Sequence, residues 1–181
     1  DAPKCAAEAV ASFLAGAPET PCAEVTNRYA PTPRPPASLA AVKPAAGIGG
    51  RRGQAVAATL ATVTDARRQV IGEALTQNRI PSRVGGLRSG TVAARVSGDE
   101  IALTLRRYVY VPGLTVSGRF VTGKGGTVTV RSRGLTGQLR ITGSGAASGT
   151  LGGRRVSTGR AASVDRSFPT LEEVRAAMRR W

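Results

Sequence analysis

Arginine side chains carry the clearest chemistry in this chain of 181 residues. Six of them alternate with apolar residues, so in extended segments they fall on the side opposite the apolar positions. A guanidinium group offers planar, bidentate donors to carboxylate and phosphate, and such a face would attract anionic polymers. We therefore predict an anion-binding surface made of Arg95, Arg106, Arg119, Arg131, Arg133 and Arg140.

The overall charge agrees with an anionic partner. The formal net charge is +15, from 26 Lys and Arg against 11 Asp and Glu. An anionic cell-wall polymer is the partner that we expect. Nucleic acid is less favoured, because single-strand platforms interleave exposed aromatic residues and only Tyr108 and Tyr110 are placed to help. Two plainer explanations stay open: a GC-rich codon bias toward arginine, and a sheet face that is merely solvated.

The chain contains no histidine. This removes the usual general base for a serine or cysteine nucleophile, and two cysteines without histidine cannot complete a tetrahedral zinc site. The nearest match to a nucleophile elbow, at 143–145, lacks the strand-turn-helix context that the elbow requires. We expect no catalytic residue and no metal ligand in this chain.

Two glycine-rich segments invite a phosphate-loop interpretation. Gly47, Gly49 and Gly53 precede a predicted helix, but the dinucleotide fingerprint also needs a preceding strand, and 43–46 is not one. The glycines at 123–126 lack the spacing of a Walker loop and are typical of a hairpin turn. We expect no cofactor.

The first 22 residues predict one amphipathic helix that stops. Apolar residues recur at helical spacing, Gly16 stands where a C-cap belongs, and prolines follow it. A lone helix of about three turns is unstable in water. The face formed by Val10, Phe13 and Leu14 therefore needs a partner surface.

Two cysteines, Cys5 and Cys22, bracket this helix. An isolated pair favours an exported protein with a disulfide. The geometry permits the bond, because the helix climbs about 16 Å to Gly16 and the six residues back to Cys22 can span about 20 Å. We expect a Cys5–Cys22 disulfide and a secreted or cell-surface location. The alternative is that each cysteine pairs with one outside this sequence.

The pattern of Cys, small residues, Val, Phe-Leu, Gly, Pro and Cys resembles the last helix of secreted bacterial α/β-hydrolases of the tripeptidyl-aminopeptidase-like group. Later segments resemble the basic C-terminal extension of that family and occur in the same order over 1–160. They are APTPRPP, SLAAVKPAAGIGGRRG, RYVYVPGLTVSGRF and TGQLRITGSGAASGTLGGRRV.

The resemblance implies a peptidase or esterase with a serine nucleophile, but its catalytic residues map onto nothing in this chain and would lie upstream. The chain would then be a non-catalytic accessory region that serves packing, surface attachment or substrate shielding, with the upstream catalytic domain as its partner. Whether it acts within an enzyme stays open. The alternative is an autonomous exported basic binding module for anionic cell-wall polymers or, less favoured, nucleic acid.

The elements that must position the arginines follow a linker at 30–53 that is rich in proline and glycine. We expect 47–53 to be too flexible for regular structure, and Ser38 to Val42 to make one helical turn. An uninterrupted apolar stripe then predicts a long helix over 54–78. The predicted stripe contains Val56, Leu60, Val63, Val70, Ile71 and Leu75.

After Pro81 the apolar period changes from helical to two. About seven short strands follow, which predicts an antiparallel meander. They lie at 91–97, 101–105, 114–122, 127–133, 135–141, 149–151 and 154–160.

The expected fold is α+β, with the long helix on an open sheet; a small closed barrel is the alternative. The helix would bury its stripe against strand residues such as Leu103, Leu105, Val128 and Leu139. A capping-box spacing predicts a short C-terminal helix. The expected domains are 1–29 as the last hydrolase helix, 30–53 as the linker, 54–160 as the helix-plus-sheet domain and 161–181 as the tail helix. No apolar run approaches the length of a membrane span.

Overall fold

The structure is a computed structural model that describes residues 10–16, 34–77, 79–97 and 100–159. The chain divides into two compact units, Asp1–Thr32 and Pro33–Trp181. In the first unit residues 10–14 are helical, and the N–H of Gly16 donates to the carbonyl of Phe13 at 3.2 Å with a φ of 65° at the glycine. The predicted C-cap is therefore confirmed. The predicted Cys5–Cys22 disulfide and the predicted helix at 161–181 lie outside the described residues.

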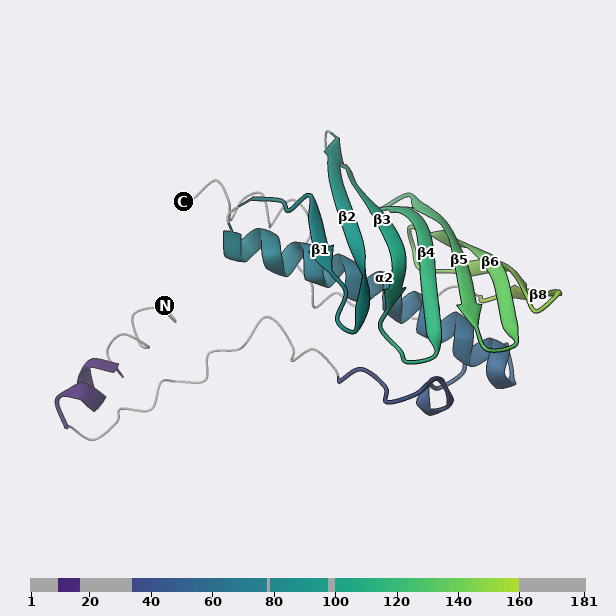
Figure 1. Ribbon diagram of the computed structural model, residues 1–181, viewed down its shortest axis with the longest axis horizontal. Helices are drawn as coiled ribbons and strands as arrows, with labels where there is room; N and C mark the ends of the chain where they lie inside the picture. The colour runs from purple at the N-terminus through teal and green to yellow at the C-terminus, as the bar shows by residue number, and fades with distance from the viewer. Residues whose placement is uncertain (1–9, 17–33, 78, 98–99, 160–181) are drawn as a thin grey trace. The chain divides into compact units, whose positions relative to one another are not determined.

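The second unit is one long helix on an antiparallel sheet of eight strands (Figure 1). The strands lie in the sheet in the same order as in the sequence, and each pairs with the next. The sheet is open, so the α+β prediction is confirmed in its open-sheet form. The elements are η1 (Leu39–Ala41), α2 (Gly50–Gln77), β1 (Arg83–Gly85), β2 (Ser89–Ser97), β3 (Glu100–Val109), β4 (Leu114–Val121), β5 (Gly125–Ser132), β6 (Leu135–Thr142), β7 (Ala147–Leu151) and β8 (Arg154–Ser157).

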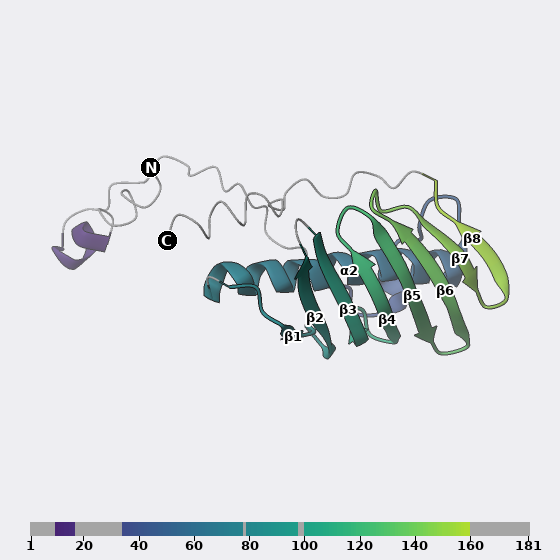
Figure 2. The ribbon, with the colours of Figure 1, turned by 90° about the horizontal axis from the view of Figure 1, so that it is seen from above.

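Helix α2 crosses the strands and runs along one face of the sheet, from the β8 end to the β1 end (Figure 2). Val56, Val63 and Val70 are buried, in one core with the predicted strand residues of β3, β5 and β6. Leu60 is only half-buried. The prediction that Leu75 is buried is wrong, because the C-terminal end of α2 extends beyond β1 and leaves 44% of Leu75 exposed.

The helix begins four residues earlier than predicted, so the expectation of irregular structure is wrong for residues 50–53. The preceding chain turns back over the first helical turn, where the N–H of Ala45 donates to the carbonyl of Gly53 at 3.0 Å. A Cβ at Gly53 would lie 1.8 Å from the carbonyl oxygen of Ile48. Glycine is therefore needed there, and it permits the close packing that starts the helix.

The predicted turn at 38–42 is present as η1, which packs its buried Leu39 into the core. Strand β1 was not predicted, because it has three residues and only Val84 among them is even half-buried. A strand this short carries no alternation that could reveal it.

Strand β3 contains a bulge that changes which face its side chains occupy. Arg106 and Arg107 are consecutive and both exposed, and the register against β4 shifts between Leu105 and Tyr108. Arg107 has a φ of 45°, which is rare for a residue other than glycine. The extra outward residue turns Tyr108 to the inner face, where it is fully buried.

Candidate anion-binding site

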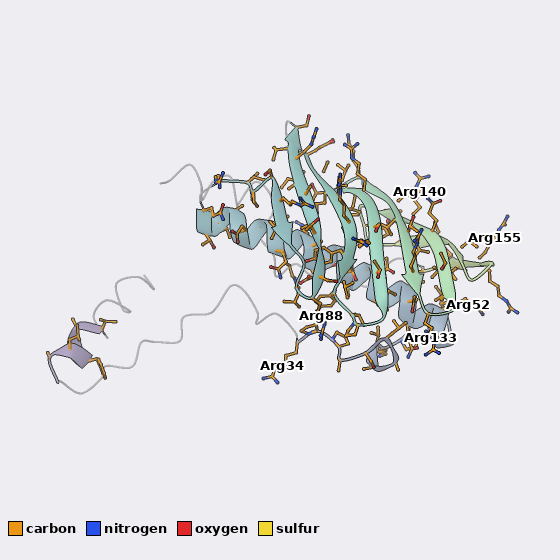
Figure 3. The ribbon with its side chains drawn as sticks, viewed as in Figure 1. Arg34, Arg52, Arg88, Arg133, Arg140 and Arg155 are labelled. Carbon is orange, nitrogen blue, oxygen red and sulfur yellow. The ribbon has the colours of Figure 1, made fainter. Side chains whose placement is uncertain are left out.

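Five of the six predicted arginines lie on the outer face of the sheet, opposite α2. Each alternates along its strand with a side chain that is buried on the inner face. Arg133 is the exception, because it lies in the turn between β5 and β6 (Figure 3). The expectation that Arg133 lies on a strand of the outer face is therefore wrong. The outer-face set is Arg95 on β2, Arg106 on β3, Arg119 on β4, Arg131 on β5 and Arg140 on β6.

The strand register places small residues beside these arginines. Arg119 lies between Thr104 and Thr127 of the neighbouring strands, and Arg140 lies between Thr127 and Ser148. Like charges directly opposite each other would destabilise the sheet, and this register avoids them. Only β5 lies between Arg119 on β4 and Arg140 on β6, so they are two strand spacings apart, which corresponds to about 9–10 Å.

The same spacing continues along the face. Arg131 lies between Thr115 and Thr136 on its neighbouring strands. Arg106 is paired with Thr91 of β2. From β3 to β6 the outer face therefore alternates guanidinium groups with hydroxyl groups, which are both donors to an oxyanion, whereas Arg95 on β2 is paired with Ala102.

Three further arginines on this side of the sheet were missed from sequence. Arg83 belongs to the unpredicted β1 and donates through Nη2 to Oγ1 of Thr91 at 3.4 Å. Arg107 is turned outward only by the bulge. Arg155 lies on β8 and is paired with Thr150. The apolar alternation could have identified Arg155, because Val156 beside it is buried.

Acidic groups do little to balance this charge. Glu100 is the one acidic side chain that the structure describes in the strands. It forms an ion pair with Lys124, and both side chains are exposed. A pair of this kind is screened by water and contributes little to stability. The outer face is therefore strongly positive over the described strands.

The β7–β8 end of this face is hollowed. A shallow trough of about 460 Å³ is lined there by Ser148, Gly149, Thr150, Arg155, Val156 and Ser157. Its volume is within the range of small-molecule sites. Arg140 lies next to Ser148 on the β6 side, so arginines stand at two sides of the trough (Figure 3).

The inner face holds a separate polar cluster. Asp65 of α2 is buried, and burial raises the pKa of its carboxyl group although hydrogen bonds from Tyr108 and Gln69 and the charge of Arg68 oppose the shift. Burial, and then the neighbouring Asp65, also raise the pKa of Tyr108. This cluster lies between helix and sheet and is closed to a polymer on the outer face.

The two tyrosines are not available to nucleobases. Tyr108 is fully buried and Tyr110 is 7% exposed, both on the inner face. The expectation that they could assist nucleic-acid binding is wrong, because the bulge in β3 turns them toward α2. The outer face of the described strands carries no tyrosine, phenylalanine or tryptophan.

Within residues 10–16, 34–77, 79–97 and 100–159, no three potential metal-ligating side chains gather in one place. Among those same residues there is no helix with the length and apolar character needed to cross a membrane.

Comparison of the chain with protein-family models, with curated proteins and with solved structures finds no match. The similarity to secreted hydrolases therefore stays a prediction from the quoted segments.

Proposed function

We propose that the chain is a non-catalytic binding module that attaches to anionic polymers through the outer face of its sheet. One observation carries this proposal: arginines on five adjacent strands share that face, and those on β3 to β6 are paired with Thr or Ser residues of neighbouring strands. A phosphate-rich cell-wall polymer would bridge several of these groups at once. Binding would release its counterions, which makes the interaction favourable and salt-dependent.

Nucleic acid fits this face less well. Single-stranded nucleic acids gain about 1–3 kcal/mol for each base that stacks on an aromatic side chain. The described outer face offers charge and hydroxyl groups but no aromatic ring. A polymer whose charge is not accompanied by bases is therefore the better partner.

Titration of the full chain with long-chain polyphosphate tests this function, with single-stranded DNA as a second ligand. In the variant Arg119→Gln/Arg140→Gln we expect about tenfold weaker polyphosphate binding and a shallower dependence of affinity on salt. The variant Arg34→Gln/Arg79→Gln is the matched control. It removes the same charge from exposed positions outside the outer face and should change the affinity much less.

Equal losses in the two variants would mean that net charge alone drives binding and would refute the proposal. Tighter binding of single-stranded DNA than of polyphosphate at equal salt would favour a nucleic-acid partner instead.

A second function is favoured by the first unit. Val10, Phe13 and Leu14 are 58%, 68% and 78% exposed on a short helical segment. Clustered exposed apolar residues mark interaction surfaces. We propose that this segment packs on a hydrolase domain encoded upstream and that the module attaches that enzyme to the cell surface. A reading frame upstream with a Gly-x-Ser-x-Gly motif, and with a histidine shortly before Asp1, would support this assignment. A frame without them would refute it.

A further inference from the structure

A pocket lies between the start of α2 and the edge strand β8. It has a volume of about 330 Å³. This is at the lower end of the range for small-molecule sites, so the pocket suits a small ligand. It is distinct from the outer-face trough, although Arg155, Val156 and Ser157 of β8 border both. Its lining residues are Gly47, Ile48, Gly49, Arg52, Arg154, Arg155, Val156 and Ser157.

Three arginines from two distant parts of the sequence line this pocket. Arg52 comes from the first turn of α2, and Arg154 and Arg155 come from β8. Figure 3 shows Arg52 and Arg155 at the same end of the sheet. Within the part of the chain that the structure describes, none of the three side chains forms a hydrogen bond or an ion pair. Their mutual repulsion would be relieved by a bound anion.

The backbone of β8 adds donors at the same place. The N–H of Thr158 donates to the carbonyl of Ala147 at 2.8 Å, so Thr158 directs its backbone groups toward β7. Backbone groups alternate in direction along an antiparallel strand. Arg155 and Ser157 therefore direct theirs away from β7, at the free edge of the sheet.

The opposite wall is held in place by the close packing at Gly53. The N–H of Ile48 donates to the carbonyl of Ala45 at 3.0 Å, and this turn contacts the first turn of the helix. The wall formed by Gly47, Ile48 and Gly49 is thus fixed relative to Arg52 before a ligand arrives. Pre-positioned donors reduce the ordering cost of binding.

We propose that this pocket is a binding site for a small phosphate anion of the pyrophosphate class. Arg52 and Arg154 contact its oxygens from the two walls, and the edge N–H groups of Arg155 and Ser157 on β8 complete the site. The bound group could be a free phosphate anion or the phosphate terminus of a polymer; the chemistry of recognition is the same. The proposal does not depend on the function assigned to the outer face.

The test is isothermal titration of the full chain with inorganic pyrophosphate at fixed salt. The variants Arg52→Gln and Arg154→Gln should each weaken binding about tenfold or more. The matched control is Arg51→Gln, because Arg51 is exposed on the same helical turn but does not line the pocket. Its affinity should stay within about twofold of the wild type. Thermal unfolding of each variant without ligand verifies that it is folded.

Equal weakening by Arg51→Gln, or unchanged binding in both pocket variants, would overturn the proposal. The variant Arg119→Gln/Arg140→Gln should bind pyrophosphate normally, which separates this pocket from the outer face. Loss of pyrophosphate binding in that variant would instead assign the anion to the outer face. Competition of long-chain polyphosphate with pyrophosphate in Arg119→Gln/Arg140→Gln would identify polymer ends as a source of the bound group, and its absence would identify the free anion.

Discussion

The hydroxyl of Tyr108 on β3 donates a hydrogen bond of 2.7 Å to Oδ2 of Asp65 on α2. Tyr108 is fully buried and Asp65 is 4% exposed. The bond joins helix and sheet through their shared core, and it is available only because the bulge at Arg106 and Arg107 turns Tyr108 inward. A surface feature of β3 thus determines an interior contact.

Replacing Tyr108 by Phe should destabilise the fold. The substitution removes the hydroxyl donor and leaves a buried carboxyl oxygen of Asp65 without it, at a cost of about 1–3 kcal/mol. Urea denaturation of wild type and Tyr108→Phe measures the difference. An unchanged free energy of unfolding would show that Asp65 finds another donor.

The raised pKa of Asp65 predicts a pH dependence. Folded Asp65 holds its proton more tightly than unfolded Asp65, so ionisation of this carboxyl lowers the free energy of unfolding. The wild type should therefore gain stability relative to Asp65→Asn as the pH falls from above the folded pKa toward the ordinary value of 3.8. Denaturation series at several pH values would detect the trend. The opposite slope would mean that the partners of Asp65 outweigh its burial.

A matched pair of glycines tests the bulge. Gly90 faces it with a φ of 80°, and a Cβ at Gly90 would lie 2.2 Å from the carbonyl oxygen of Arg107. Gly113 has nearly the same φ, 81°, but nothing lies within 4 Å of its Cβ position. Gly113→Ala should cost about 1–2 kcal/mol from the backbone alone, and Gly90→Ala should cost clearly more. Equal losses in chemical denaturation would contradict a tightly packed bulge.

The shared core can be tested along α2. Val56→Asp places an unpaired charge in a fully buried site and should cost several kcal/mol. Amide exchange protection should fall in the strands as well as in the helix. Leu75→Asp is the control, because Leu75 is 44% exposed and its substitution should leave strand protection nearly unchanged. Loss of helix protection alone in Val56→Asp would refute a common core.

The disulfide prediction can be checked directly on Cys5 and Cys22. Protein produced in an oxidising compartment should show no free thiol by mass spectrometry after alkylation without reductant. Two labelled cysteines would contradict the predicted bond.

Much of the fold follows from local sequence. The alternation of Leu103 and Leu105 with polar residues predicts β3, and the spacing of Val56, Val63 and Val70 predicts the buried face of α2. Leu75 belongs to the same stripe but is exposed, because its burial depends on where the sheet ends. The periodicity of apolar residues within one helix cannot show how far the sheet beneath it extends.

The arginines of the outer face were easier to predict from the sequence than the pocket was. Arg119 and Arg140 can be assigned to the outer face because side chains alternate between the two faces along a strand, and this needs only their neighbours in the sequence. The pocket forms only because the fold brings Arg52 and Arg154 to the same place, although about a hundred positions separate them in the sequence. The glycines before α2 match no phosphate-binding motif, so only the folded arrangement reveals their place beside these arginines.

The sequential order of the strands, β1 to β8, has a consequence for folding kinetics. Every strand pairing can form as a hairpin between neighbours in the chain, so the loop-closure entropy of each step is small. Such low contact order favours rapid, stepwise growth of the sheet. The contacts between distant residues are those of α2, which reach from β1 to β7. Docking of the helix should therefore come late and provide the cooperativity that the meander lacks.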